Sequence, residues 1–350
     1  MARPSTNAVL LMSGAFLLVV AAFAFRNWSR PLADHANPRV SDARLRELRL
    51  RSERDSTAAD AAVEAYHSHV PGRLDDVSIP AEDILRGLPG VLEVERLVAP
   101  AKPSRRIVHL RDLHFVPRDL FALDVRQATG RPLSETEVDR LYEQHLLETD
   151  LVQIEQMVLL RCLARHHRLH SIHIEGLTAE KEPLFRQQVA ALKGLEEKQI
   201  KDARVQLREV RCLMQAMEAA GKTNTNRYGS AAGIEKELLD LLDQHRPQLL
   251  EFDAAGRLLL AGEIGAVLAL DDGPLLDLAK PVTPDGRVKF DSSKVRQRED
   301  AQVKAAINAG PFALIVLGGA HDLSDSIRRV AGADCEYVRV TTKTYKEFGP

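Results

Sequence analysis

The sequence predicts an α/β protein whose sheet is mostly parallel or mixed and is flanked by helices. Short apolar, β-branched runs alternate with amphipathic helical stretches along the chain. Several of these runs end directly in glycine, histidine or a carboxylate, as strands do at the ligand-binding edge of such a sheet. A long helical stretch with one break separates two of the runs, and it predicts a helical hairpin inserted between strands.

The composition is that of a globular protein of 350 residues, which is enough for one large or two ordinary domains. Lysine and arginine total 48 and aspartate and glutamate total 50, so the formal net charge of -2 gives no reason to expect a nucleic-acid partner. Cys162, Cys212 and Cys335 lie far apart, without the spacing of a zinc or redox motif. We expect them to be packed thiols.

The amino terminus carries a candidate transmembrane helix. Residues 8–25 are uncharged and would form a helix of about 27 Å, close to the thickness of a bilayer core. A cleaved signal peptide is the alternative, with residues 22–24 as the cleavage site. Arg26 and Arg30 favour a cytoplasmic carboxyl side, yet large domains can be translocated despite such a bias. We expect a membrane-anchored protein with an extracytoplasmic core domain, and its orientation stays open.

Three regions divide the chain. Residues 1–30 form the anchor or signal segment, residues 31–104 a linker with helical and short-strand elements, and residues 105–350 the α/β core, with the insertion at about 178–250. The elements predicted in the second region are a charged helix at 42–69, a short acidic helix at 81–88 and a strand at 91–98.

The core opens with a strand, a helix and a second strand. The strand at 106–110 is followed at once by charged residues, and the capping box of Ser134 and Glu137 then starts a long amphipathic helix. The next strand, at 169–174, ends in a glutamate and a glycine. A strand, helix and strand in this order predict a right-handed parallel unit.

The insertion follows this unit. Residues 178–220 are predicted as helix almost throughout, residues 221–229 break it, and a second helix follows at 234–245. We interpret the two helices as a hairpin that acts as a lid or an oligomerisation arm. Apolar residues of the first helix alternate steps of four and three, as on a coiled-coil seam, so we expect packing residues at Ala203, Leu207, Val210, Met214 and Met217.

The last third of the chain supplies the remaining elements. Residues 257–270 are an apolar stretch that a glycine splits into strand and turn, and residues 271–291 are an irregular loop. A helix at 292–308 leads into a buried strand at 312–317, and an alternating edge strand at 336–342 closes the chain.

Charged groups follow several of the predicted strands. Asp112 and His114 come after the first core strand, Glu175 ends the next, and His321 with Asp322 follows a glycine turn after the buried strand. Because the carboxyl ends of parallel strands share one edge of a sheet, we expect these groups to converge. Each group alone has a structural explanation as an ion pair, a helix cap or a core residue, but their joint arrival at strand ends favours a site.

These motifs resemble those of a known superfamily. An acid-x-His motif after one strand, a helix rich in glutamine and leucine, a strand ending in Glu-Gly and a late strand ending in Gly-x-x-His are similar to the TIKI-type superfamily. It includes erythromycin-esterase-like proteins, ChaN-like haem-uptake lipoproteins and membrane-tethered metalloproteases. The arginine-acid motif at 298–301 is a further match, whereas Arg111-Asp112 replaces the usual Gly-Glu. By position, the resemblance implies site roles for His114, Glu175, Arg298 and His321.

The leading hypothesis is a hydrolase of this type that cleaves an ester or amide bond in a small molecule or peptide. In it, His114 or Glu175 activates water, His321 is a second base or ligand, and Arg298 stabilises an anion. Imidazole and carboxylate together suit a divalent zinc, manganese or iron ion, so a metal could assist the reaction. Its expected ligands are Asp112, His114, Glu175 and His321.

Two alternatives belong to other classes of protein. The first is a non-catalytic haem- or metal-binding protein of the ChaN-like type, in which the same histidines ligate iron. The second is a degenerate, membrane-tethered scaffold that acts through its long helices. Those helices also offer a surface for a homo-oligomer.

Overall fold

A six-stranded mixed sheet forms the centre of the fold. The structure, a computed structural model, describes residues 40–67, 72–130, 132–279 and 291–349. The strands lie in the order β1-β6-β2-β5-β3-β4, with β1 antiparallel to β6 and the other neighbours parallel. The predicted α/β class with a mixed sheet is confirmed. The strands are β1 (Val91–Val98), β2 (Arg105–Asp112), β3 (Ser171–Thr178), β4 (Ala266–Asp271), β5 (Phe312–Gly318) and β6 (Cys335–Thr342).

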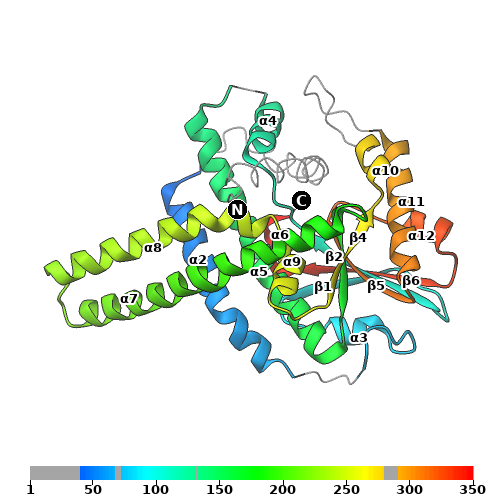
Figure 1. Cartoon of the computed structure of the whole chain (residues 1–350), viewed down its shortest axis with the longest axis horizontal. Coiled ribbons are helices and arrows are strands. Elements are labelled where there is room, and N and C mark those ends of the chain that lie inside the picture. Colours follow the sequence, from blue (N-terminus) through cyan, green and yellow to red (C-terminus); the bar gives the residue numbers. More distant parts are fainter. Residues whose placement is uncertain (1–39, 68–71, 131, 280–290, 350) are drawn as a thin grey trace, which may run out of the picture.

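Helices cover both faces of this sheet (Figure 1). One face carries α11 (Ser292–Asn308) and α12 (Ser324–Val330). The other face carries a larger set of helices, which are α2 (Asp42–Ala65), α3 (Ala81–Leu85), α5 (Glu135–His167), α6 (Glu182–Leu195) and α9 (Asp253–Leu260). A sheet covered on both faces needs strands that are apolar on both sides, and β5 has six buried residues in succession from Ala313 to Gly318.

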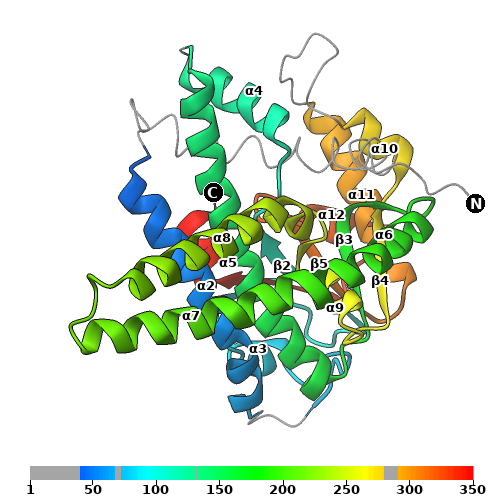
Figure 2. The ribbon, with the colours of Figure 1, turned by 60° about the vertical axis from the view of Figure 1, so that its left-hand side comes forward.

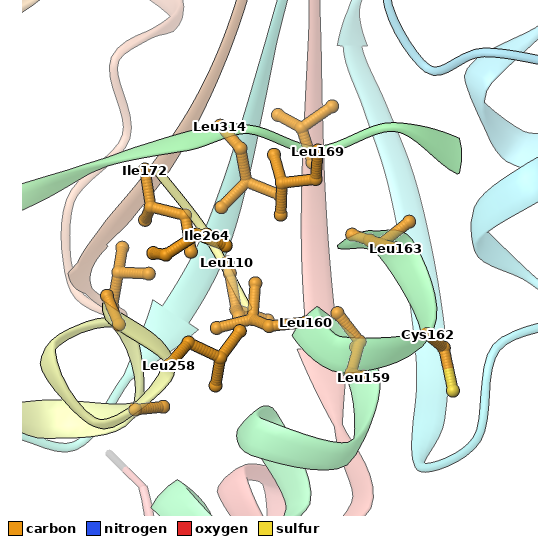
Figure 3. Packing of buried hydrophobic residues seen from close by; sticks show 14 of the residues in the cluster. Leu110, Leu159, Leu160, Cys162, Leu163, Leu169, Ile172, Leu258, Ile264 and Leu314 are labelled. Carbon is orange, nitrogen blue, oxygen red and sulfur yellow. The ribbon is translucent and has the colours of Figure 1, made fainter. Parts of the chain in front are cut away.

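The contact between α5 and the strands is rich in leucine (Figure 3). Leu160 of α5, Leu110 of β2 and Leu314 of β5 belong to this cluster, and none of the three is more than 1% exposed. Full burial of one such side chain contributes about 1.5–3 kcal/mol. The cluster therefore fixes α5, and with it the glutamines of this helix, against the sheet.

The helix α5 begins where its capping box predicts. The hydroxyl of Ser134 accepts a hydrogen bond from the backbone N–H of Glu137 at 3.3 Å, and the carboxylate of Glu137 accepts one from the backbone N–H of Ser134 at 2.9 Å. Two donors of the first turn are thus satisfied. The short helix α4 (Arg118–Thr129) precedes this start and packs against the first turns of α5.

The described residues between 40 and 104 are part of the core rather than a separate linker region. The strand β1 pairs with β6 along its length, and α2 packs along α5. The helix and strand predicted at 42–69 and 91–98 are present as α2 and β1, and the short acidic helix is present as α3, which ends at Leu85. The sheet therefore begins with β1 and not at Arg105.

Three predicted elements differ in the structure. The last strand, β6, is not an edge strand, because it lies between β1 and β2. Residues 257–260 belong to the helix α9 rather than to a strand, since a short apolar run does not distinguish a buried helix from a strand. Chain segments predicted without regular structure contain α10 (Gly273–Leu278) and α13 (Lys343–Phe348).

The predicted helical hairpin is formed by α7 (Lys201–Ala219) and α8 (Asn226–Leu250). A short π-helical segment, Glu196–Ile200, joins α7 to α6. Ala203 and Leu207 of α7 pack against Leu238 and Leu242 of α8, as the seam predicts. In both views the pair projects from the body of the molecule, with its turn at the far end (Figures 1 and 2).

Buried charges hold the base of this hairpin. Arg246 of α8 pairs with Asp150 of α5 and donates to the hydroxyl of Ser52 on α2 at 3.1 Å. Both Arg246 and Asp150 are less than 10% exposed. Removing one partner of such a pair leaves a buried charge uncompensated, so the base is tied firmly to the core.

Two of the three cysteines are packed as predicted. Cys162 and Cys335 are buried, whereas Cys212 is exposed on α7, which corrects the prediction for that residue. The candidate transmembrane helix, residues 8–25, lies outside the described residues. Within the described ranges, no helix is long and apolar enough to cross a membrane.

Candidate functional site

The carboxyl ends of four neighbouring strands bring the predicted groups together. In the pairing of β2 with β5, Asp112 lies opposite Gly318, and in that of β3 with β5, Ile174 lies opposite Val316. The strand β4 ends at Asp271, beside the end of β3. Side chains that follow these positions meet at one edge of the sheet, as in other open α/β proteins.

His114 lies between two carboxylates. Its Nδ1 atom is 2.7 Å from Asp112 Oδ2, and its Nε2 atom is 2.7 Å from Glu175 Oε2. Burial alone would lower the pKa of His114, but the charges of Glu175 and Asp112 raise it to about 10. The ring is therefore an imidazolium that donates a hydrogen bond from each nitrogen.

Every oxygen of Glu175 is engaged. Oε2 accepts from His114 and, at 2.8 Å, from the backbone N–H of Gly318, while Oε1 accepts from Arg298 Nη2 at 2.9 Å. Burial would raise the pKa of Glu175, but Arg298 and the histidines hold it well below its usual range. The carboxylate is therefore permanently charged at neutral pH and is held in one orientation.

Gly318 makes this contact possible. A Cβ atom at this position would lie 3.1 Å from His114 Nε2 and 3.2 Å from Glu175 Oε2. Both distances are tighter than ordinary van der Waals contact, so a side chain would press on the bond between His114 and Glu175. The glycine that ends β5 thus lets the carboxylate reach the strand.

Arg298 binds two carboxylates and is fully buried. Besides Glu175 it holds Asp271 with two hydrogen bonds, of 2.6 Å from Nε and 2.7 Å from Nη2. Asp271 also accepts from Gln302 at 3.0 Å and from the backbone N–H of Gly176 at 2.7 Å. The left-handed φ of 80° at Gly176 marks the bulge in β3 that turns this N–H toward Asp271. Arg298 therefore acts by positioning Glu175.

His321 lies on the far side of Glu175. Its Nε2 atom is 3.5 Å from Glu175 Oε1, and its Nδ1 atom is 3.1 Å from Glu299 Oε1. Burial opposes its charge, but the charge of Glu175 raises the pKa of His321 overall. The neighbouring Asp322 is turned away and caps α12 through the backbone N–H of Ser324 at 2.9 Å.

A cavity of about 40 Å³ adjoins His114 and Glu175. One of its walls is formed by Gln153 of α5, whose Nε2 donates to the carbonyl of Leu250 at 3.2 Å. Gln153 Oε1 is fully buried and has no hydrogen-bond partner among the described residues. The space exceeds the 10–15 Å³ or so that one water molecule needs. The cavity is therefore large enough to hold a water molecule. The remaining lining residues are Asp112, Phe115, Ile174, Phe185, Leu250, Glu251 and Asp253.

The predicted metal ligands converge but do not form a metal site in this arrangement. Metal-bound imidazole must offer an unprotonated nitrogen, whereas both nitrogens of His114 face carboxylates. The oxygens of Glu175 are likewise taken up by nitrogen donors. In the part of the chain that the structure describes, no group of three histidine, cysteine or acidic residues could hold a metal ion. Haem would need a pocket of several hundred Å³, far larger than this cavity. Metal and haem stay predictions from the resemblance.

All five site residues predicted from the sequence lie in one network: Asp112, His114, Glu175, Arg298 and His321. Other residues of the network and of the cavity wall were not predicted, among them Asp271, Gln302 and Asp253. Asp271 has the same signal as the others, since it ends an apolar run, but that run was interpreted as part strand and part turn. Gln302 lies one turn after Arg298 on the same face of α11. Asp253 has no sequence signal, because it follows the insertion rather than a strand.

Comparisons with known proteins add no assignment. No protein-family model matches the chain, and neither a curated protein nor a solved structure matches it significantly.

Proposed function

We propose that this protein is a hydrolase that cleaves an ester or amide bond at the edge of the sheet beside His114 and Glu175. One observation carries the proposal. A buried imidazole, fixed between two carboxylates, adjoins a water-sized cavity that is also lined by the carboxyl residues Glu251 and Asp253. Buried ion networks also occur for structural reasons, and the position of this one beside a cavity lined by carboxyl groups favours a functional role.

The geometry assigns a different role to His114 from the one predicted. Since both of its nitrogens donate, His114 does not remove a proton from water. Its positive charge instead adjoins the cavity, where it would stabilise the negative charge that develops on a carbonyl oxygen under attack. A fixed charge in a site with little water requires no reorganisation during the reaction and is effective for that reason.

Charged side chains behind His114 keep this arrangement rigid. Arg298 and Asp271 hold Glu175, and Glu175 holds His114. Because Arg298 is fully buried, it does not contact a substrate, and its effect on the reaction passes through Glu175. The cavity accepts only a water molecule and the reacting carbonyl group, so the rest of the substrate would lie outside it.

The resemblance to the TIKI-type superfamily supports this proposal, since erythromycin-esterase-like members hydrolyse esters. The membrane anchor at residues 8–25 remains part of the proposal and would hold the enzyme at a membrane surface.

The test is hydrolysis by the full-length chain, purified in mild detergent. Its substrates would be p-nitrophenyl acetate, p-nitrophenyl butyrate and an unstructured peptide. We expect a rate above that of buffer for at least one of them. His114→Ala and Glu175→Gln should each lower kcat/KM at least about 100-fold, because the first removes the fixed positive charge and the second removes the carboxylate that holds it.

Asp322→Asn is the matched control, since Asp322 also follows β5 but caps α12 outside the network. Circular dichroism and a melting curve would show that each variant is folded. No hydrolysis by the wild-type chain, or full activity in both site variants, would refute the proposed function.

A further inference from the structure

The insertion contributes a wall to the cavity. The hairpin helix α8 ends at Leu250, and the junction between α8 and α9 places Glu251 and Asp253 opposite the strand ends. These two carboxyl groups share the cavity with His114 and Glu175. Groups from an insertion and from the sheet edge thus face the same small space.

The strand-end groups that line the cavity are Asp112, His114 and Glu175, and they leave the proposed reaction without a base. His114 donates from both nitrogens, and both oxygens of Glu175 accept hydrogen bonds. Asp112 Oδ1 accepts from Gln156 at 2.9 Å, and Asp112 Oδ2 forms an ion pair with His114 Nδ1 at 2.7 Å. Hydrolysis by water needs an acceptor for the water proton. The acceptor must therefore come from elsewhere in the cavity wall.

Asp253 is held so that one oxygen is available. Its Oδ1 atom accepts from the backbone N–H groups of Ala255 at 2.7 Å and Gly256 at 3.0 Å. No hydrogen bond within the described residues uses its Oδ2 atom. By contrast, no described residue forms a hydrogen bond that fixes the carboxylate of Glu251, so Glu251 is a less well placed acceptor than Asp253.

The backbone of Asp253 is strained at this point. Its φ of 47° lies in the left-handed region, which glycine, asparagine and aspartate tolerate best and which costs other residues about 1–2 kcal/mol. Non-glycine residues held in this region are enriched at functional sites. The strained turn begins α9 and places the carboxyl group on the cavity.

We infer that Asp253 is a catalytic residue, the general base that takes a proton from the attacking water. This inference rests on the proposed function. As the water oxygen bonds to the carbonyl carbon, its proton passes to Asp253 Oδ2. When the bond from carbon to the leaving oxygen or nitrogen breaks, the same proton passes to that atom. The products are a carboxylic acid and an alcohol or amine, and Asp253 is again a carboxylate.

The charges around Asp253 suit this role. Asp112 and His114 face it from the end of β2, Glu175 from β3, and Glu251 from its own segment; Gln153 of α5 and Phe185 of α6 are uncharged. Burial and the negative charge of Asp112 raise the pKa of Asp253 to about 7. A base whose pKa lies near the working pH is the most effective one.

The decisive variant is Asp253→Asn in the full-length chain, assayed on the ester that the wild type hydrolyses fastest. Asparagine tolerates the left-handed backbone and can accept the same two N–H bonds, so the fold should persist. We expect kcat to fall at least about 100-fold with little change in KM. The wild-type kcat should fall below about pH 7, and the residual activity of Asp253→Asn should not show this dependence.

Asp291→Asn is the control, because Asp291 caps α11 in the same way, through the N–H of Ser293 at 3.0 Å, at an exposed position. If Asp253→Asn does not fold, the test is the kcat of Asp253→Gly with and without added formate. Glycine relieves the backbone strain, and formate supplies the missing carboxylate. A kcat of Asp253→Gly that increases with the formate concentration supports the inference.

The outcomes are separable. Full activity and an unchanged pH profile in Asp253→Asn, or no response of Asp253→Gly to formate, would overturn this inference and leave the proposed function standing. Absence of hydrolysis by the wild-type chain would overturn both.

Discussion

Two carboxylates share the protons of His114, one at each ring nitrogen. Such an imidazolium is stable only while both neighbours are charged, and Glu175 is kept charged by Arg298. The residues of the site therefore depend on one another, and substitutions within the network should not have additive effects.

The contacts of His114 with Asp112 and Glu175 make the stability of the protein depend on pH. The pKa of His114 rises from its ordinary 6.5 to about 10 on folding. The folded state therefore binds the proton more tightly than the unfolded state, so the stabilisation is complete below pH 6.5 and is lost as the pH rises toward 10. In this interval the free energy of unfolding should fall by up to about 1.4 kcal/mol per pH unit.

Urea unfolding of the wild type and of His114→Gln at pH 6.5, 8 and 9.5 would measure the effect. The variant lacks the titrating ring, so the difference between the two proteins should shrink as the pH rises. Parallel curves for the two proteins would show that His114 does not carry this linkage.

Asp112, His114 and Glu175 were predictable from the sequence because each follows an apolar run directly. Their convergence follows from parallel pairing alone. Asp253 was not predictable in this way, because it reaches the cavity through the tertiary position of the insertion. The hydrogen-bond roles at His114 also depend on distances that no sequence pattern contains.

The turn that follows β5 is packed closely against α13. A Cβ atom at Gly319 would overlap the hydroxyl oxygen of Tyr345 on α13. The ring of Tyr345 is 1% exposed and lies against Arg111, whose guanidinium carbon is 4.7 Å from the ring centroid. Neither the Tyr345 ring nor the Arg111 side chain can move easily to make room for a methyl group at Gly319.

Gly319→Ala should therefore destabilise the protein by about 1–3 kcal/mol or more, because the methyl group overpacks this contact. Gly233→Ala in α8 is the matched control of opposite sign. Nothing lies within 4 Å of its Cβ position, and alanine in an exposed helix should stabilise it by about 0.5–1 kcal/mol. Guanidinium unfolding of both variants measures the two changes, and an unchanged midpoint for Gly319→Ala would contradict the packing argument.

Elements fixed by local signals were predictable with nearly correct ends. The capping box of Ser134 and Glu137 set the start of α5, and the helix α11 has the predicted limits. Elements whose position depends on pairing with distant segments of the chain were not predictable from the sequence. The position of β6 between β1 and β2 is set by pairing across more than 200 residues, which an alternating pattern at the end of the chain does not encode.

At the scale of the whole molecule, the hairpin of α7 and α8 projects from the body and is anchored to it by buried charges at its base (Figure 2). Beyond Leu242, toward the turn, α7 and α8 pack mainly against each other. Local opening is easiest where few buried contacts hold a segment.

Hydrogen–deuterium exchange of the full-length chain should therefore show fast exchange near the turn at residues 220–226 and slow exchange in β2 and β5. In Arg246→Met, which removes the buried partner of Asp150, fast exchange should extend to the base of α8. Residues 152–163 of α5 serve as an internal control. Equal protection of the hairpin turn and of β5 would show that the hairpin is not a separate unit.

The strand order has a consequence for the synthesis of the chain. β2 and β3 do not touch each other in the finished sheet, because β5, made more than 130 residues after β3, lies between them. A growing chain therefore exposes the open edges of β2 and β3 until residues 312–318 leave the ribosome. Pairing between such distant segments is slow, and exposed edges are prone to aggregation. The ends of β2 and β3 are held at their final spacing only after β5 has inserted between them, so the contact of His114 with Glu175 forms late in folding.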